Sequence, residues 1–379
     1  MYLLYRIKLS FLIIVISSFS IIAQAEKDTA APLTIDGAIN KSKQVIKDFM
    51  MENKVPGMSA AASINGRLIF SEGFGYADLE NGVSATKHTK FRIASISKPI
   101  TASGLALLYE KGIIDLDEPI QKYLPAFPEK RWKVTLRNLA SHQAGIRGYL
   151  GKEFLSNQHF DTVSEGVDIF RNDTLVFKPG TKYGYSTYGY NLISEVIEGA
   201  SGKDFLTFVQ KNIFDPLNMN SIIADHSDSL IAHRSSFYSY SDSGEIVNSK
   251  FVDISNKWAG GGFISNAEDL VKFGNANIFN GFLEEATRNL FFSEVLTASG
   301  EKTKYGLGWV SDVDQFGFNW VGHSGGAVGG RSMLILYPED KIVVALLTNL
   351  GPAKAPVAEA QEIANFLRQT FNNKVSEVK

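Results

Sequence analysis

Hydrophobic and polar positions follow different periods along the chain, and the two ends differ from the middle. Near the N-terminus, apolar residues recur at helical spacing from Ile39 to Met50, and two strand-like segments, 59–64 and 68–74, flank Asn65-Gly66. Both residues of an Asn-Gly pair tolerate positive φ, so the pair predicts a two-residue β-hairpin turn. Near the C-terminus, further strand-like segments precede a helical pattern over 357–371. These segments are 309–310, 318–321, 332–337 and 342–348.

The middle of the chain, from residue 95 to about 280, has mostly helical periodicity. Ser265 and Glu268 have the spacing of a capping box, which predicts the start of another helix there. Strands at both ends with helices between them predict an α+β fold, in which an antiparallel sheet is built from the two chain ends and a helical subdomain is inserted. The α/β part is expected over about 34–95 and 281–372, and the helical part over about 96–280. The polar, aperiodic segments 150–175 and 222–250 are expected to be surface loops.

The first 25 residues have the composition of a secretory signal peptide. Arg6 and Lys8 precede a mostly apolar stretch, 9–22, and Ala23-Gln24-Ala25 supplies the small residues of a cleavage site. Cleavage after Ala25 would leave a short tether, 26–33, before one catalytic domain over 34–372. An uncleaved anchor is the alternative. Either reading places the domain outside the cytoplasm, in the periplasm or the medium.

Composition and charge exclude several classes of function. Lys plus Arg (38) nearly balance Asp plus Glu (40), and the net charge of −2 gives no attraction for a nucleic-acid backbone. The sequence contains no cysteine, which excludes disulfides, thiolate metal sites and a cysteine nucleophile. The histidines lack the spacing of a zinc site, so no metal and no other cofactor is expected.

Ser-x-x-Lys is the first candidate for chemistry, because on a helix it places a hydroxyl and an amine on the same face. The sequence contains four matches, and chance alone predicts roughly two or three in a chain of this composition. They are Ser84/Lys87, Ser95/Lys98, Ser299/Lys302 and Ser376/Lys379. Only Ser95/Lys98 opens a long apolar helix, so this pair is the preferred candidate.

Two later segments strengthen that choice. Residues 179–190 form a turn-rich run with four tyrosines directly before a helical pattern. Gly322-His323-Ser324-Gly325-Gly326 follows a strand-like segment, and its small residues would let a substrate backbone lie against a strand edge. Gly322-x-Ser324-x-Gly326 also matches the nucleophile elbow of α/β-hydrolases. That fold requires an acid and a histidine after the serine, and no histidine follows His323.

Together these segments resemble the serine β-lactamase and penicillin-binding-protein superfamily, in the branch related to class C β-lactamases. In that branch Ser-x-x-Lys, Tyr-x-Asn and a Lys/His-Ser/Thr-Gly triplet occur in this order. The resemblance covers about residues 35–370 and within the branch is nearest to the mitochondrial β-lactamase-like serine proteins of animals. It rests on 91–98, 139–146, 185–190, 258–263 and 323–329.

The resemblance implies roles for individual residues. Ser95 would be the acylated nucleophile and Lys98 its activating neighbour, while Tyr185 would share the general-base role and protonate the leaving group. The backbone N–H groups of Ser95 and Gly326 would form the oxyanion hole. Whether Lys98 or Tyr185 takes the first proton stays open at this stage.

The substrate-binding positions implied by the resemblance are Thr187, His323, Ser324 and Gly325. His323 stands where a lysine is common and would bind a substrate carboxylate when protonated, with Ser324 bonding the same group. Thr187 stands where the family pattern has Asn and has no amide to bind a substrate carbonyl. The sequence therefore predicts poor turnover of β-lactams.

The prediction is an exported serine hydrolase that transfers the acyl group of a small-molecule or peptide amide or ester to water through Ser95. A true β-lactamase and a D-Ala-D-Ala carboxypeptidase are alternatives. A different class of function is a penicillin-binding sensor or a filament-forming scaffold, because the animal relatives are known to form filaments. Oligomerisation is therefore open, and no membrane span is expected after cleavage of the signal.

Overall fold

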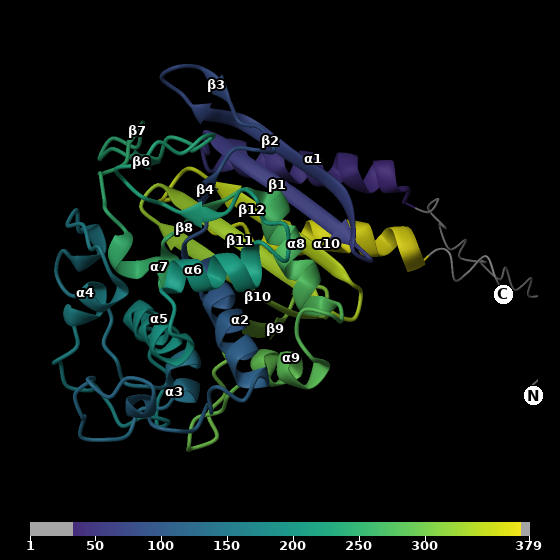
Figure 1. Ribbon diagram of the computed structural model, residues 1–379. Helices are drawn as coiled ribbons and strands as arrows, with labels where there is room; N and C mark the ends of the chain where they lie inside the picture. Colours follow the sequence, from purple (N-terminus) through teal and green to yellow (C-terminus); the bar gives the residue numbers. More distant parts are fainter. Residues whose placement is uncertain (1–32, 373–379) are drawn as a thin grey trace, which may run out of the picture. The chain divides into compact units, whose positions relative to one another are not determined.

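The computed structural model describes residues 33–372, which form one body of strands and helices (Figure 1). Seven strands make an antiparallel sheet in the order β3-β2-β1-β12-β11-β10-β9. The strands are β1 (Gly57–Ile64), β2 (Arg67–Asp78), β3 (Val83–Ser84), β9 (Val310–Val313), β10 (Asn319–Ala327), β11 (Gly330–Tyr337) and β12 (Ile342–Thr348). The predicted α+β fold with a sheet built from both chain ends is confirmed.

The β1–β2 hairpin and the pairing of β1 with β12 join the two ends of the chain. Asn65 and Gly66 have φ values of 51° and 74°, the left-handed conformation that a two-residue hairpin turn requires. On the other side of β1, Ala61 lies opposite Ala345 in an unbroken antiparallel register. The sheet therefore cannot be completed until the last strand of the chain has joined the first.

Helices cover both faces of the sheet. Helices α1 (Ile35–Glu52) and α10 (Val357–Asn372) pack on one face, and α8 (Ala267–Ile278) packs on the other. Neighbouring strand residues point into different cores, as Val343 and Val344 do. Because β12 is buried on both faces, its residues 342–347 are all apolar and show no polar alternation.

The remaining helices form a second group beside the sheet (Figure 1). Their bounds are α2 (Ser97–Glu110), α3 (Leu136–Ala140), α4 (Val163–Asp168), α5 (Thr187–Ser201), α6 (Phe205–Val209), α7 (Trp258–Gly261) and α9 (Glu285–Phe292). Short strands β4 (Phe91–Arg92), β5 (Ile223–Ala224) and β8 (Phe263–Ser265) form a small sheet, and β6 (Tyr238–Tyr240) pairs with β7 (Ile246–Asn248). Short 3₁₀ or π segments are η1 (Ala94–Ile96), η2 (Ile120–Lys122), η3 (Glu153–Leu155), η4 (Gln210–Phe214) and η5 (Ser255–Lys257). Helices α2 and α5 pack together at the centre of this group and bring Ser95 near Tyr185.

The structure corrects one local prediction and moves one boundary. The capping residue of α8 is Asn266, whose side chain accepts from the N–H of Asp269, and not Ser265. Ser265 ends strand β8 opposite Phe91 and is therefore still in extended conformation. Because α8 packs on the sheet, we propose that the α/β part resumes before this helix and not at residue 281.

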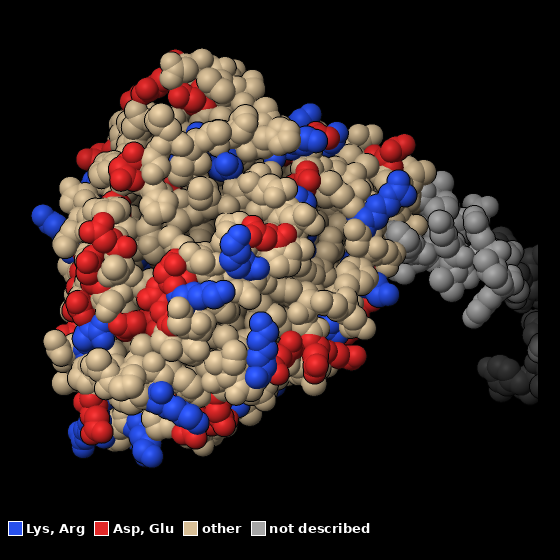
Figure 2. Space-filling view, in the orientation of Figure 1, with Lys and Arg blue, Asp and Glu red and all other residues tan. Residues whose placement is uncertain are grey.

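The predicted signal peptide and all but the last residue of the predicted tether lie outside the described residues. Within residues 33–372, no helix combines the length and the hydropathy that crossing a bilayer requires. On the face shown in Figure 2, basic and acidic side chains are interspersed.

Candidate functional site

Ser95 lies at a sharp bend between strand β4 and helix α2. The residue before it, Ala94, has φ = 49°, a left-handed conformation that is uncommon for a residue with a side chain. Ser95 then lies in η1, the 3₁₀ turn that leads into α2. At the start of a helix the backbone N–H groups have no acceptor within the helix. Ser95 also lines a neighbouring cavity.

Lys98 and Tyr185 both hydrogen-bond with the Ser95 hydroxyl. The distance from Ser95 Oγ to Lys98 Nζ is 3.1 Å, and to the Tyr185 hydroxyl it is 2.9 Å. Lys98 Nζ also lies 3.3 Å from Thr187 Oγ1 and 2.6 Å from the Gly260 carbonyl oxygen. The three predicted catalytic side chains therefore meet at one point, although Tyr185 is 90 residues from Ser95 in the sequence.

Burial changes the protonation chemistry of this cluster. Lys98 is completely buried, and its desolvation, helped by the charge of Lys257, lowers its pKa well below the usual value of 10.5. Tyr185 exposes 43% of its surface, yet desolvation of its phenol raises its pKa. The two shifts favour a neutral amine and a neutral phenol beside Ser95.

An aromatic cluster holds Tyr185 in place. The ring of His142 lies 4.2 Å from that of Tyr185 and 4.7 Å from that of Tyr305, measured between centroids. Nδ1 of His142 accepts from the backbone N–H of Ser186 at 3.2 Å. Desolvation, followed by the charges of Lys98 and His323, lowers the pKa of His142 well below 6.5, so the ring is neutral. His142 therefore supports the loop that carries Tyr185.

Strand β10 passes next to Ser95 with one edge open. Strand β9 pairs with β10 only as far as Gly322, whereas β10 continues to Ala327. A Cβ atom on Gly325 would lie 2.4 Å from the Ile93 carbonyl oxygen and 3.0 Å from the Ala94 Cβ, so only glycine permits this approach. The sequence analysis expects these small residues to let a substrate backbone lie against a strand edge, and the unpaired part of β10 is such an edge.

His323 lies on β10 but is not placed to act as a cation. Its Nε2 lies 3.0 Å from the Tyr305 hydroxyl, and its Nδ1 contacts the Ser324 carbonyl oxygen. Desolvation, with a contribution from the charge of Lys98, lowers the pKa of His323 to about 3. The ring is therefore neutral at neutral pH, and the carboxylate contact expected from a protonated His323 lacks its charge.

Thr187 begins α5 and contacts Lys98 instead of offering an amide to a substrate. Its position against α7 is tight, because a Cβ on Gly260 would lie 2.4 Å from the Thr187 methyl group. Ser324, by contrast, lies within β10 and not at the strand-to-helix turn of a nucleophile elbow, so the structure removes that alternative.

The other Ser-x-x-Lys pairs do not resemble the Ser95 cluster. Ser84 with Lys87 and Ser299 with Lys302 are exposed on the surface. The fourth pair, at the C-terminus, lies outside the described residues.

Sequence reasoning did not assign Lys257, the Gly260 carbonyl or Tyr305 to the site. Lys257 and Gly260 flank Trp258 in a segment that contributed only to the family resemblance. A lysine directly before an apolar, glycine-rich run was the available signal for Lys257. Its burial depends on residues about a hundred positions earlier in the chain, which no local pattern reveals.

Comparison with known proteins agrees with this geometry. A family model described as Beta-lactamase matches residues 43–367. The chain belongs to the β-lactamase family. This superfamily includes the penicillin-binding proteins, so the predicted resemblance is confirmed.

Relatives within the β-lactamase family include proteins from animals, bacteria and archaea. The chain is 32% identical to the human mitochondrial serine β-lactamase-like protein LACTB, over 80% of this chain and 72% of that protein. It is 31% identical to penicillin-binding protein 4* of Bacillus subtilis, over 82% of this chain and 72% of that protein. An octameric penicillin-binding-protein homologue from Pyrococcus abyssi superposes with a TM-score of 0.75 at 26% identity, covering 87% of this chain and 77% of that one.

Proposed function

We propose that this protein is an exported serine hydrolase that cleaves amide or ester bonds through a Ser95 acyl-enzyme. The observation that carries the proposal is the position of the Ser95 hydroxyl between the Lys98 amine and the Tyr185 phenol, at 3.1 and 2.9 Å. A hydroxyl needs a base within hydrogen-bond distance to attack a carbonyl, and a leaving group needs an acid. This cluster supplies both.

In this proposal Lys98 takes the first proton. Its pKa is lowered, so the neutral amine is available to accept the Ser95 proton as Oγ forms a bond to the substrate carbonyl carbon. The pKa of Tyr185 is raised, which makes its phenol a proton donor and not a phenolate base. Tyr185 gives its proton to the leaving nitrogen or oxygen as that bond breaks. The protonated Lys98, whose Nζ lies 4.9 Å from the centre of the Tyr185 ring, then returns a proton to the phenolate, so both groups become neutral again. Water then attacks the acyl-enzyme by the reverse route.

The backbone N–H groups of Ser95 and Gly326 are proposed to stabilise the oxyanion of both tetrahedral intermediates. Both residues line the same cavity, and the start of a helix and the open edge of β10 are suitable sources of unpaired donors. Donors aimed at a developing oxyanion typically lower the barrier by about 2.7–4 kcal/mol each. Ser324 and Gly325, on the same edge, are proposed to align the substrate backbone.

Peptides and small esters are proposed as substrates in preference to β-lactams. The hydroxyl of Thr187 is already in contact with Lys98 and Thr187 has no amide, and His323 has no charge at neutral pH.

A fluorophosphonate or a fluorescent penicillin followed over time tests the proposal in the wild type and in Ser95→Ala. Label that appears on Ser95 and then decays supports a hydrolase, and persistent label would indicate a sensor. No Ser95-dependent label would indicate a scaffold. Rapid steady-state hydrolysis of nitrocefin would contradict the substrate ranking.

Export and assembly complete the proposal. The signal-like N-terminus supports export, with cleavage expected after Ala25. N-terminal sequencing of the exported protein tests this.

The octameric relative from Pyrococcus abyssi supports self-association of this chain. Native mass spectrometry of the mature protein would give its oligomeric state, and a monomer at micromolar concentration would contradict self-association.

A further inference from the structure

A second buried lysine lies in the same cavity as Ser95. Lys257, at the end of η5, lines this cavity of about 40 Å³ together with Ser95, Thr187 and Gly326. Tyr185, which in the proposed mechanism protonates the leaving group, does not line the cavity. Since the proposed proton donor for the leaving group lies outside this cavity, we assign the cavity to the acyl part of the substrate.

Lys257 has few partners for a buried cation. The residue is 6% exposed, and its Nζ donates one hydrogen bond, to the Phe154 carbonyl oxygen at 3.3 Å. The rings of Tyr149 and Phe154 each lie 5.0 Å from Nζ. Lys98, by comparison, contacts three acceptors. An ammonium group has three donors, so Lys257 has capacity for further acceptors.

No carboxylate within the described part of the chain pairs with Lys257 at 4.0 Å or less. The negative charge of Asp253 raises the pKa of Lys257. The Asp253 carboxylate itself is hydrogen-bonded to Ser227, His159 and the N–H of Ser255. A buried ammonium without a paired anion is costly, and a bound carboxylate would relieve that cost.

Lys257 remains mostly cationic near neutral pH. Desolvation is the main cause that lowers its pKa to about 8, with a contribution from Arg92, while Asp253 acts in the opposite direction. A group with this pKa is protonated at pH 7. The site therefore offers a positive charge at the pH where the neutral amine of Lys98 is proposed to act.

A larger groove continues from the cavity and has no acidic lining. This groove, of about 480 Å³, shares Phe154, Gly326, Ala327 and Val328 with the smaller cavity. Its charged residues are Lys250 and Arg331, and no Asp or Glu lines either space among the described residues. The face shown in Figure 2 carries both basic and acidic groups, whereas the charged residues that line these two spaces are all basic.

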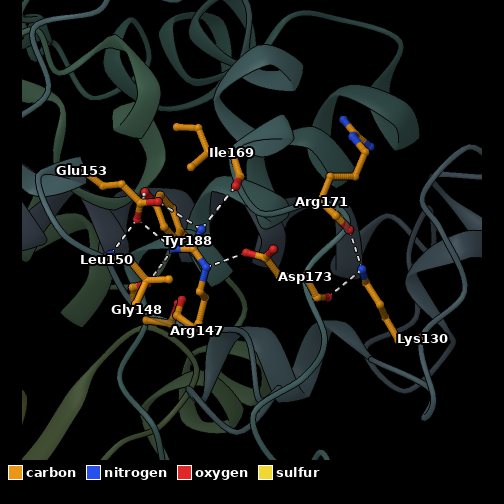
Figure 3. A network of polar contacts seen from close by, with 10 residues as sticks. Lys130, Arg147, Gly148, Leu150, Glu153, Ile169, Arg171, Asp173 and Tyr188 are labelled. Atoms are coloured by element: carbon orange, nitrogen blue, oxygen red, sulfur yellow. Dashed lines mark hydrogen bonds and ion pairs between the residues drawn. The ribbon is translucent and has the colours of Figure 1, made fainter.

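The wall that holds Lys257 is tied down by ion pairs. Arg147 pairs with Glu153 at 2.7 Å and with Asp173, as Figure 3 shows. Glu153 also accepts from the Leu150 N–H at 2.7 Å and the Tyr188 hydroxyl at 3.0 Å. These bonds fix both ends of the segment that carries Tyr149 and Phe154, so the position of Nζ is preorganised.

We propose that Lys257 is an anion-binding residue that selects acyl donors carrying a carboxylate close to the carbonyl that Ser95 attacks. The proposal rests on the proposed function for its catalytic consequence, but binding of the anion does not require turnover. An acidic peptide side chain, such as that of Asp at the residue whose carbonyl is cleaved, has the required chemistry. In the complex the carboxylate supplies the anionic partner that Lys257 lacks among residues 33–372 of the free protein.

The kinetic test compares two isosteric substrates, acetylated dipeptide anilides that end in Asp or in Asn. We expect kcat/KM to favour the Asp substrate by about 10- to 100-fold, the range of a charge-assisted hydrogen bond in a partly buried site. Lys257→Met should bring the ratio to about 1, and Lys257→Arg should retain a preference for Asp. Lys250→Met, which removes an exposed lysine of the neighbouring groove, is the matched control and should leave the ratio unchanged.

Two kinetic results would overturn the proposal. An unchanged ratio in Lys257→Met, with both substrates slowed equally, would mean that Lys257 only tunes the pKa of Lys98. If Lys250→Met lowered the Asp-to-Asn ratio of kcat/KM as much as Lys257→Met does, the preference would come from the overall positive charge of the groove and not from Lys257. Near-ultraviolet circular dichroism verifies that each variant is folded.

Binding to Ser95→Ala separates this proposal from the proposed function. Isothermal titration of acetyl-Ala-Asp-amide and acetyl-Ala-Asn-amide should show tighter binding of the acid by at least about 10-fold, a difference that is lost in Ser95→Ala/Lys257→Met. This result would uphold the anion site even if the wild type hydrolysed neither substrate. Equal binding of the two peptides would overturn the anion site even if hydrolysis were observed.

Discussion

At the residue scale, the contrast between two buried lysines near Ser95 explains how one site could offer both the proposed base and a cation. Lys98 is surrounded by a hydroxyl of Ser95, a hydroxyl of Thr187 and a carbonyl, none of them negatively charged. Desolvation without a counter-charge favours its neutral form. Desolvation also lowers the pKa of Lys257, to about 8, and a group with this pKa is mostly protonated at pH 7. Lys98 therefore suits the proposed role of a base, and Lys257 suits that of an anion-binding cation.

Removing the amine of Lys98 should slow acylation of Ser95 strongly. Lys98→Met places an unbranched side chain, one atom shorter than lysine, at a completely buried position and deletes the proposed base. We therefore expect the rate of fluorophosphonate labelling to fall by about 10²- to 10⁴-fold. Stopped-flow measurement of labelling gives the rate. A fall of less than about 5-fold would contradict the assignment of Lys98 as base.

The pH dependence of acylation should follow the neutral form of Lys98. A lowered pKa means that the amine loses its proton well below pH 10.5, so the rate should rise with pH and level off above that lowered pKa. The groups that face Lys98 are Lys257, which is positive below about pH 8, and the neutral Tyr185 and His323. Rates measured from pH 4 to 10 on a neutral ester test this. A rate that is still rising at pH 10 would contradict it.

Preference for an acidic acyl group should change with pH in the opposite direction. Lys257 is protonated below its pKa of about 8 and neutral above it, so the Asp-to-Asn ratio should be high at pH 7 and decline through pH 8 to 9. The charged groups acting on Lys257 are Arg92 and Asp253, and Lys98 responds to its charge. Kinetics of both anilides across this range measure the decline, and a ratio independent of pH would argue against Lys257.

The sequence supported the proposed catalytic residues better than the residues around them. Ser95, Lys98 and Tyr185 each lie in a recognisable motif, and the structure brings their side chains together. The charge state of His323 could not be predicted, because its low pKa comes from burial against Tyr305 and the nearby Lys98. The environment of Lys257 was hidden for the same reason, since burial is a property of the folded chain.

At the element scale, most strands and helices followed from periodicity, and the differences have local causes. The β1–β2 turn was predictable because Asn65-Gly66 prescribes it. The segment 150–175 was expected to be a surface loop and instead contains η3 and α4. Its order depends on Arg147, whose partners are spread over the segment and are invisible to a pattern of apolar residues.

Breaking the Arg147 network should loosen the wall of the acyl cavity. Arg147→Met removes ion pairs with Glu153 and Asp173 that are partly screened by solvent, and we expect it to lower the free energy of unfolding by about 1–3 kcal/mol. It should also reduce the preference for acidic acyl groups, because Tyr149 and Phe154 no longer hold Lys257. Urea unfolding and the Asp-to-Asn ratio measure the two effects.

Arg137→Met is the matched control for Arg147→Met. Arg137 makes a bidentate ion pair with Asp117 in which the carboxylate side chain is 63% exposed, so its loss should cost less than about 1 kcal/mol. The substrate preference should stay as in the wild type. Equal effects of the two substitutions would show that the Arg147 network has no special part in the cavity wall.

At the scale of the whole molecule, the sheet connects two hydrophobic cores. One core lies under α1 and α10, and the other lies between the sheet and the helices around Ser95. Alternate residues of β11 and β12 point into each core, so neither core can loosen without disturbing the same strands. The site depends on this arrangement because β10, one strand further, forms its open edge.

A cavity made in the core remote from Ser95 should therefore weaken the site as well. Leu367 of α10 is completely buried, and Leu367→Ala should cost about 2–5 kcal/mol of unfolding free energy. We expect urea to abolish Ser95 labelling and to change the fluorescence of Trp320, which lies in the remote core, at the same lowered concentration. Leu296→Ala, at a residue 49% exposed, is the control and should stay within about 0.5 kcal/mol. Loss of the Trp320 signal while Ser95 still reacts would mean that the two cores unfold separately, and the sheet would then not couple them.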